Sequence, residues 1–350
     1  MDTMCFEITQ DERNAGTLTP EKLKRIRHSF ATNGYAVVSR FISPETCELL
    51  YQSVLEDVAR IRARPEPTLH EQRTGVGHLQ LGLRRYAPFV KAEFVANPLI
   101  ESIVAALLGP GAWLGFYNGN VNTPGSGAQP LHYDRPYAWK AEAEATAAGQ
   151  PWPPPTITVS CSVALFDITA ESGATEIYPG SQRETAVADW PRGERVEHHP
   201  VLIAQWGPPG RMAIPAGGIC FRDPRMWHRG MPNHGDKTRP MIALTYHSGL
   251  AKHWRGLLAP NLSDEEQQRC AEDPTLRVMD NGTLGDGRLV FDESARAAFE
   301  STANLHGVVR NARFVAAPLT VNHFVDAHEL GGARVVNTGE VTPYPNIETK

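Results

Sequence analysis

The chain has 350 residues, of which 41% are hydrophobic and 21% are charged, and its formal net charge is −5. This is the composition of an ordinary globular protein, and the acidic balance argues against nucleic-acid binding. The five cysteines are scattered and form no C-x-x-C pair, which indicates free thiols in a reducing compartment. We therefore expect a cytoplasmic protein. The sequence shows neither a signal-peptide pattern nor an apolar run of ~18 residues, so we expect no secretion and no membrane span.

The first hundred residues are predicted to be mainly helical. Apolar periodicity and capping residues indicate helices over 21–30, 43–64 and 97–108, with a strand over 35–39. The second helix has the clearest start, because Ser43 is a suitable N-cap and Pro44 occupies the first helical position.

A Gly-rich segment, residues 75–86, separates the second helix from the third. We predict that it forms a loop over the mouth of a binding site. His78, Arg84 and Arg85 then either contact a substrate or are surface charges of that loop.

The middle of the chain is rich in strand signals. Strands are predicted over 113–122, 156–166, 212–215, 219–221 and 241–246, and residues 141–155 and 183–210 are predicted to be insertions. With helices on both flanks, this pattern favours a mainly β protein with a double-stranded β-helix, a jelly-roll or cupin-like barrel. We expect a single domain over residues 1–350, in which a helical flank (1–111) precedes the β core (112–249) and an extension of unassigned role (250–350) follows it.

The strongest chemical signal is the pair His132 and Asp134. In a strand, residues i and i+2 point to the same face, so an imidazole and a carboxylate would lie together. Two histidines and one carboxylate hold iron in non-haem Fe(II) oxygenases and leave three coordination positions open. The third ligand should come from much later in the chain, where His228 follows a short predicted strand.

The pair also has plainer interpretations. His132 and Asp134 are equally compatible with a hydrogen-bonded structural pair. A second His-x-Asp pair, His234 and Asp236, lies in a predicted turn, where strand alternation does not apply.

Three stretches of this sequence resemble the phytanoyl-CoA dioxygenase family of Fe(II)/2-oxoglutarate oxygenases. They are Pro130-Leu-His-Tyr-Asp-Arg-Pro-Tyr137, the Gly-containing turn and strand over 169–182, and residues 216–233, which end near His228. The resemblance spans roughly residues 112 to 249. It implies that His132, Asp134 and His228 bind Fe(II), and that O2 and 2-oxoglutarate react there, with ascorbate as a supporting reductant.

The resemblance also implies how 2-oxoglutarate is held. Arg239 has the spacing from His228 at which the family places the arginine for the far carboxylate, and a planar guanidinium suits a carboxylate. Asn118, Asn122 and Gln129 are the amides expected to contact the cosubstrate. Three other arginines, Arg222, Arg225 and Arg229, are nearer His228 in sequence and are expected to point elsewhere.

The sequence departs from the family at two positions. Gly230 stands where many members carry a small hydroxyl residue that assists the cosubstrate, and Gly218 stands where they carry an acid. We expect Asn118, Asn122 or Thr158 to compensate. The aromatic residues Tyr137, Trp139 and Trp227 either wall the cavity or belong to the core.

These observations predict an oxygenase that hydroxylates, desaturates, cyclises or epoxidises a small molecule, such as a natural product, with release of succinate and CO2. The competing interpretations are a cupin-like binding protein with another metal or none, and a metal-dependent isomerase on the same fold. The extension over 250–350 is a candidate homodimer contact.

Overall fold

The fold is described from a computed structural model. It describes residues 5–63, 71, 74–81, 88, 97–109, 112–134, 141–147, 149, 151–188, 190 and 194–248, together with four short strands near the C-terminus. These strands pair as β11 (Gly282–Gly285) with β12 (Arg288–Phe291) and β13 (Arg334–Val335) with β14 (Val341–Thr342). The predicted dimer contact of the extension, and the predicted roles of Arg84, Arg85, Tyr137 and Trp139, lie outside the described residues.

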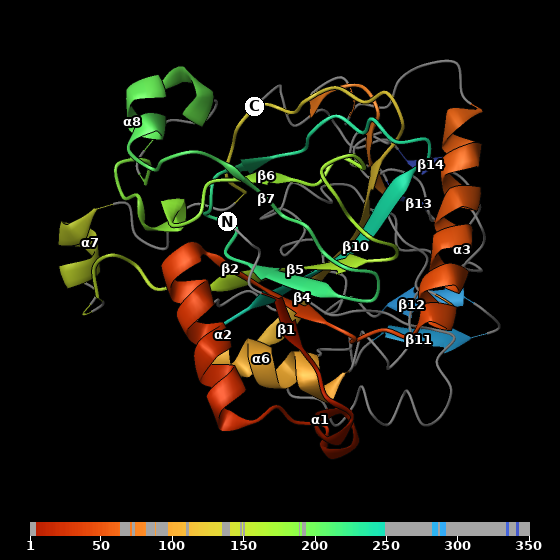
Figure 1. Cartoon of the computed structure of the whole chain (residues 1–350), viewed down its shortest axis with the longest axis horizontal. Helices are drawn as coiled ribbons and strands as arrows, with labels where there is room; N and C mark the ends of the chain where they lie inside the picture. The colour runs from red at the N-terminus through yellow and green to blue at the C-terminus, as the bar shows by residue number, and fades with distance from the viewer. Residues whose placement is uncertain are drawn as a thin grey trace.

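Two sheets form the centre of the molecule (Figure 1). The major sheet has the order β1 (Cys5–Glu7), β2 (Tyr35–Ser39), β8 (Ile219–Arg222), β5 (Thr158–Ala164), β10 (Arg239–His247), β4 (Trp113–Asn122) and β3 (His78–Leu81). All neighbours are antiparallel except β1 and β2. The minor sheet has the order β7 (Gly210–Arg211), β6 (Glu176–Ile177) and β9 (His228–Arg229).

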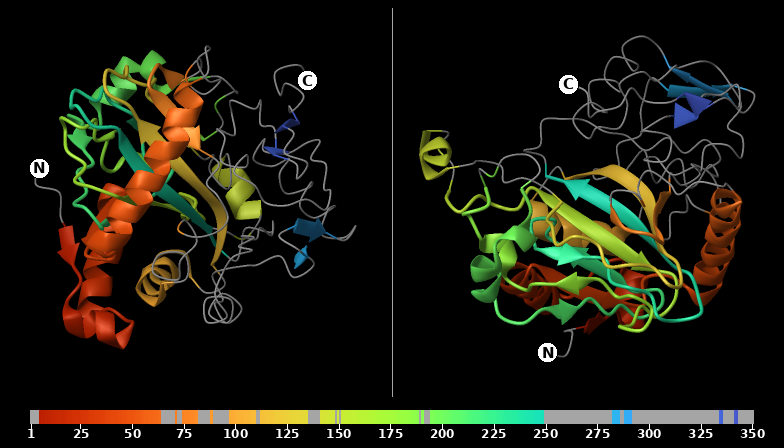
Figure 2. Two further views of the ribbon diagram at one scale, coloured as in Figure 1. Left: turned by 90° about the vertical axis from the view of Figure 1, so that its right-hand side faces the viewer. Right: turned by 90° about the horizontal axis from the view of Figure 1, so that it is seen from above.

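The two faces of the major sheet carry different residues because side chains alternate along a strand. One face is apolar and packs against α2 (Pro20–Asn33), α3 (Pro44–Arg62) and α6 (Pro98–Leu108) (Figure 2). On β5, for example, Val159, Cys161 and Val163 belong to this buried cluster. The alternate residues face inward, toward the minor sheet, and many of them are polar.

A second apolar cluster joins the two sheets. It combines Ala164 and Cys220 of the major sheet with Ile177 of β6 and with Met212 and Ile214. The predicted mainly β fold of the jelly-roll type, with flanking helices, is therefore confirmed. Three short helices, α1 (Gln10–Ala15), α7 (Glu142–Ala147) and α8 (Pro200–Ala204), and two 3₁₀ turns, η1 (Ser181–Arg183) and η2 (Val196–His198), complete the described elements.

Most predicted strands and helices are found within a few residues of their expected bounds. The strands over 35–39 and 113–122 agree at both ends. The Gly-rich segment 75–86 differs from its prediction, since residues 78–81 form strand β3 at the edge of the major sheet. The prediction failed there because flanking glycines obscured the alternation of buried Leu79 and Leu81.

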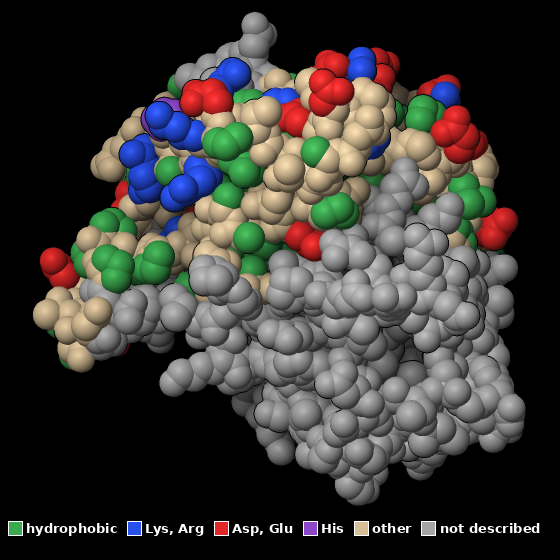
Figure 3. Space-filling model, turned by 90° about the horizontal axis from the view of Figure 1, so that it is seen from below, with side chains coloured by type: hydrophobic (Ala, Val, Ile, Leu, Met, Phe, Trp, Pro, Cys, Tyr) green, Lys and Arg blue, Asp and Glu red, His purple; other side chains and the backbone are tan. Residues whose placement is uncertain are grey.

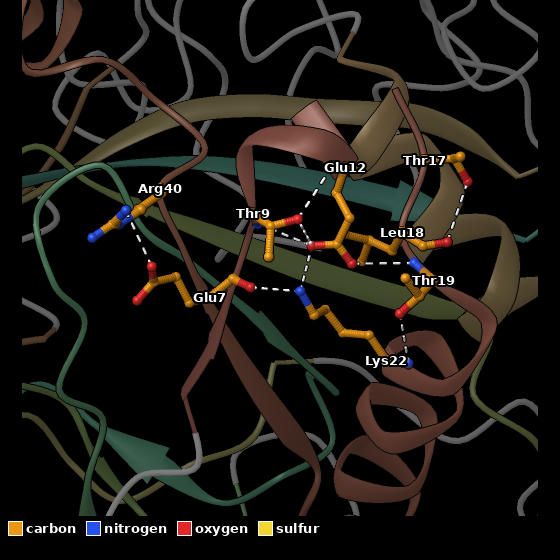
Figure 4. Close-up of polar contacts among 8 residues, drawn as sticks. All are labelled: Glu7, Thr9, Glu12, Thr17, Leu18, Thr19, Lys22 and Arg40. Atoms are coloured by element: carbon orange, nitrogen blue, oxygen red, sulfur yellow. Dashed lines mark hydrogen bonds and ion pairs between the residues drawn. The ribbon is translucent and has the colours of Figure 1, made fainter. Parts of the chain in front are cut away.

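A buried carboxylate ties the N-terminal segment to the helix that follows it (Figure 4). Glu12 is only 4% exposed. Its carboxylate accepts hydrogen bonds from the backbone amides of Thr9 and Thr19 and forms an ion pair with Lys22. Burial alone raises the pKa of Glu12, but these bonds more than offset it and lower the pKa to about 2. The ionised form of Glu12 therefore stabilises the start of α2.

Charged side chains are distributed unevenly over the surface. In the view from below, Lys and Arg side chains gather in one area, while acidic groups lie in others (Figure 3). The outer side of α2 contributes exposed basic residues, among them Lys24, Arg25 and Arg27. Among the described residues, no helix has the length and apolar character needed to cross a membrane.

We predict that Glu12→Gln lowers the free energy of unfolding by about 1–2 kcal/mol at pH 7. Because the folded-state pKa lies below the ordinary 4.5, this stabilisation is present above pH 4.5 and disappears as the pH falls toward about 2. Urea unfolding of both proteins between pH 7 and pH 2.5 measures the difference. Glu7→Gln, which removes an exposed pair with Arg40, is the control and should change stability by less than ~0.5 kcal/mol. A pH-independent difference for Glu12→Gln would contradict the assignment.

Candidate functional site

Two segments far apart in the sequence form the site by pairing their backbones. His132 and His228 exchange two hydrogen bonds, with N···O distances of 3.0 and 2.8 Å. On either side, Gln129 N donates to Gly230 O at 2.9 Å and Asp134 N donates to Pro224 O at 2.8 Å. Side chains of directly opposed residues lie on the same face. The two imidazole rings are accordingly neighbours, with their centroids 4.5 Å apart.

His132, Asp134 and His228 form a cluster that fits a metal ion. One ligand atom from each lies within 4.8 Å of the others. The Nε2 atom of His132 is 3.7 Å from Oδ1 of Asp134, and the Nε2 atom of His228 is 3.4 Å from Oδ2. This is the two-histidine, one-carboxylate donor set of open non-haem iron sites.

Both histidines are oriented by the same second contact. Nδ1 of His132 lies 2.7 Å from the carbonyl oxygen of Pro130, and Nδ1 of His228 lies 2.8 Å from that of Met226. A carbonyl only accepts, so each Nδ1 carries the proton and each Nε2 keeps its lone pair for a metal. This is the usual arrangement around metal-binding histidines.

The electrostatics keep His228 and Asp134 in the forms that bind a metal. Burial and the nearby Arg222 charge lower the pKa of His228 to about 4, so its imidazole is neutral at pH 7. Removal from water alone would raise the pKa of Asp134, but its interactions with His228, which include a hydrogen bond, and with the Arg222 guanidinium hold that pKa well below its usual range. The Asp134 side chain is 38% exposed, so this carboxylate lies at the open side of the cluster.

Arg222 contacts this cluster directly, and the expectation that it points elsewhere is wrong. Its Nη2 donates to Oδ2 of Asp134 at 2.6 Å. Arg222 reaches the cluster because it is an inward-facing residue of β8, between Tyr35 and Ser160 in the register. The contact between Arg222 and Asp134 could not be predicted from the sequence distance between Arg222 and His228, because the chain turns back between β8 and β9.

The other two rival arginines do point away from the cluster. Arg225 donates to Asp223 and to the carbonyl of Pro154, and Arg229 pairs with Glu176 at 2.7 Å. The Arg225 network fixes the turn that contains Pro224, whose carbonyl accepts from the amide of Asp134.

Arg239 is a buried cation at the other end of the inner face. It is 3% exposed, its Nη2 donates to the carbonyl of Gly173 at 3.0 Å, and its Nε lacks a hydrogen-bond partner. Burial lowers its pKa to about 10, which leaves it charged at neutral pH. No carboxylate pairs with it among the described residues. A buried charge without a counter-ion is costly, so the geometry of Arg239 fits an anionic ligand.

Asn122 lies between Arg239 and His78 in a row across three strands. Asn122 is opposite Arg239 on β10 and opposite His78 on β3, so the three residues belong to the same inward-facing row. The Nδ2 atom of Asn122 donates to the carbonyl of Met231 at 2.8 Å, and its buried Oδ1 lacks a partner. Asn118 lies four residues earlier on the same strand, opposite Ala243.

His78 and Gln129 pack against Gly230, where a side chain has no room. A Cβ built on Gly230 would lie 2.6 Å from Cε1 of His78 and 2.8 Å from Oε1 of Gln129. Gln129 accepts a hydrogen bond from Gly230 N at 2.9 Å, and Nε2 of His78 lies 2.7 Å from the carbonyl of Gly127. The buried His78 is thus a wall of the site rather than a surface charge of a loop. Burial lowers its pKa.

The remaining candidates contribute less. His234 and Asp236 are exposed and do not belong to the cluster. Trp227 is fully buried in an aromatic cluster with Tyr178 and Trp206, which identifies it as a core residue.

The residues considered in connection with the departures from the family lie as follows. Thr158 contacts His247 at 3.1 Å. A Cβ on Gly218 would lie 2.8 Å from the carbonyl of Pro215, so the backbone turn excludes an acid there.

The chain is similar to several known proteins. Residues 30–241 match the phytanoyl-CoA dioxygenase (PhyH) family. Dioxygenase andF of Emericella variicolor is 23% identical over 228 residues, covering 61% of this chain and 70% of that protein. Multifunctional dioxygenase ausE of Aspergillus calidoustus is 24% identical over 214 residues, covering 54% and 67%. The solved structure of the non-heme alpha ketoglutarate dependent carbocyclase SnoK from nogalamycin biosynthesis is 19% identical, with a TM-score of 0.49 and coverage of 74% and 94%.

We predict that His132→Ala and Asp134→Ala each abolish stoichiometric binding of Fe(II) at neutral pH, because two remaining ligands do not hold the ion. Anaerobic equilibrium dialysis with metal analysis measures the loss. His234→Ala is the matched control and should keep one equivalent of iron. Retained iron in the first two variants together with loss in His234→Ala would move the site to the second His-x-Asp pair.

We also predict that Gly230→Ser destabilises the protein by about 1–3 kcal/mol, the usual cost of forcing extra atoms into a filled space. The new Cβ would displace His78 and Gln129. Gly127→Ser is the control, because a Cβ there meets nothing within 4 Å, and it should change stability by less than ~0.5 kcal/mol. Chemical unfolding at pH 7 compares the two variants, and equal stabilities would show that position 230 is not crowded.

Proposed function

Because the chain belongs to the phytanoyl-CoA dioxygenase family, we propose that it oxidises a small molecule, of the natural-product class, with ferrous iron and 2-oxoglutarate bound on the inner face of the major sheet. The family makes the protein a 2-oxoglutarate-dependent dioxygenase. His132, Asp134 and His228 are the proposed iron ligands. The observation that carries the proposal is their convergence, with one ligand atom of each within 4.8 Å of the others.

The second support is the unpaired cation Arg239. Iron and 2-oxoglutarate, when bound, supply the oxidising chemistry, in which O2 is consumed and 2-oxoglutarate becomes succinate and CO2. Arg239 binds the far carboxylate of 2-oxoglutarate through its guanidinium, which provides the counter-ion that the burial of this residue requires. A cupin-like binding protein has no need for such a carboxylate clamp.

The amides around the site hold the rest of the cosubstrate. Gln129 accepts from Gly230 through Oε1, so its amide nitrogen is the end left to donate to a ligand. Asn122 stands beside Arg239, and Asn118 lies on the same strand nearer its middle, with a side chain that is outside the described part of the structure. We assign these three amides to the cosubstrate, with ascorbate keeping the iron reduced between turnovers.

The substrate side of the site is open at Asp134. Hydroxylation, desaturation, cyclisation and epoxidation are all oxidations of a substrate bound at this open side of the site. The described cysteines Cys5, Cys47, Cys161 and Cys220 are free thiols, which supports the proposed location in a reducing cytoplasm.

We predict that Arg239→Gln raises the KM for 2-oxoglutarate by about 100-fold, since a charge-assisted bidentate contact contributes ~2–3 kcal/mol. Arg239→Lys should recover part of the loss because it keeps the charge without the fork. The readout is succinate formed from 2-oxoglutarate with Fe(II), ascorbate and O2, without added substrate or across a panel of small natural products.

Arg195→Gln is the control, because Arg195 is an exposed arginine that pairs with Glu197. It should leave the KM unchanged. An unchanged KM in Arg239→Gln would remove Arg239 from the cosubstrate site, and a wild-type protein that binds iron but never forms succinate would contradict the proposed function.

A further inference from the structure

Arg222 places a positive charge against the metal-binding cluster. Its side chain is 8% exposed, and its Nη2 donates to Oδ2 of Asp134 at 2.6 Å. Its Nη1 lies 3.1 Å from Nδ1 of His228. Since Nδ1 of His228 donates its proton to Met226 when Nε2 binds a metal, this second contact is a close approach of two donors rather than a hydrogen bond. The Arg222 guanidinium therefore lies against Asp134 and His228 without itself being a candidate metal ligand.

The position of Arg222 is built into the major sheet. Its neighbour Phe221 belongs to the apolar cluster on the helix side, so alternation turns Arg222 inward. The backbone is fixed on both sides, by Tyr35 of β2 and Ser160 of β5. A residue paired on both sides in a sheet cannot withdraw its side chain from the inner face by a local shift.

The charges of the cluster sum to zero. Two neutral imidazoles contribute nothing, the Asp134 carboxylate contributes −1 and the Arg222 guanidinium contributes +1. A divalent ion at the cluster therefore keeps its full charge of +2, where the same three ligands alone would reduce it to +1. Charges only a few ångströms apart influence each other even beside water, so the Arg222 guanidinium acts on an ion bound at the cluster.

We propose that Arg222 shifts the two affinities of the site in opposite directions: its charge weakens binding of the divalent ion and strengthens binding of the anionic 2-oxoglutarate to the metal-loaded site. This inference rests on the proposed function. Its physical basis is that the Arg222 guanidinium repels the divalent cation and attracts the 2-oxoglutarate dianion. The metal itself also attracts the dianion, so metal and cosubstrate bind cooperatively with or without Arg222, and thermodynamic linkage makes that factor the same in both affinities.

A merely structural role for Arg222 predicts something different. If the guanidinium only orients Asp134, its loss misplaces a ligand and weakens binding of the metal, with no particular effect on 2-oxoglutarate. If its charge matters as proposed, loss of the charge tightens the metal alone and weakens 2-oxoglutarate. The two roles therefore predict opposite signs for the same measurement.

The experiment uses the full chain and Co(II), which replaces iron so that no turnover occurs. Isothermal titration calorimetry measures Co(II) affinity with and without saturating 2-oxoglutarate, and 2-oxoglutarate affinity for the Co(II)-loaded protein. In the wild type, 2-oxoglutarate should tighten Co(II) at least about tenfold, which is ~1.4 kcal/mol of coupling. In Arg222→Gln, which keeps a hydrogen-bond donor near Asp134, Co(II) alone should bind about tenfold tighter and 2-oxoglutarate should bind the Co(II)-loaded protein about tenfold more weakly, while the coupling persists.

Three further variants make the result decisive. Arg222→Lys keeps the charge and should behave like the wild type, within about threefold. Arg222→Met is a second neutral variant, used if thermal unfolding shows that Arg222→Gln is not folded. Arg195→Gln removes an exposed arginine charge and should change neither affinity.

The outcomes separate this inference from the proposed function. Weaker Co(II) binding in both neutral variants with unchanged 2-oxoglutarate affinity would overturn the inference and leave Arg222 as a residue that orients Asp134. Unchanged affinity for both Co(II) and 2-oxoglutarate in these variants would also overturn it. A wild type that binds Co(II) but no 2-oxoglutarate under either condition would contradict the proposed function itself.

Discussion

The reciprocal backbone hydrogen bonds between His132 and His228 are the constraint on which the site depends. They connect two segments that are 96 residues apart in number, at positions where each carries an imidazole. A strand register that slips by one residue turns every side chain to the other face, so these bonds decide whether the histidines meet. Flanking bonds at Gln129 and Asp134 fix the register on both sides. The cluster of His132, Asp134 and His228 is thus positioned by backbone pairing.

The inner face of the major sheet distributes charge around that cluster in two ways. Arg222 lies on β8 against Asp134, where its charge is matched by a carboxylate. Arg239 lies at the start of β10, where it is buried and has the carbonyl of Gly173 as its partner among the residues that the structure describes. We propose that the first arginine adjusts the charge of the metal site and that the second binds an anionic ligand. The apolar residues on the opposite face of the same strands hold both arginines in place through the packing of α2, α3 and α6.

Strand periodicity was sufficient to predict much of this arrangement. The strands over 35–39 and 113–122 follow from alternation alone, whereas His132 and Asp134 come together in a segment that has a single β-bridge at His132. His228 as the third ligand needed the resemblance to a family, because no local pattern shows which distant histidine will be opposite His132. The direction of the Arg222 side chain was predicted wrongly, because the chain reverses between β8 and β9 and sequence proximity to His228 does not show where a side chain points. His78 was missed as a wall of the site because its strand is short and begins next to glycines.

The central claim is that one ferrous ion lies among three side chains with an arginine available for the cosubstrate. Crystals grown without oxygen in the presence of Fe(II) and 2-oxoglutarate test it most directly, through anomalous scattering recorded at the iron absorption edge. The account predicts one strong peak bounded by Nε2 of His132, Nε2 of His228 and the Asp134 carboxylate, with the far carboxylate of 2-oxoglutarate on Arg239. A peak at His234 and Asp236, or a cosubstrate bound away from Arg239, would contradict it.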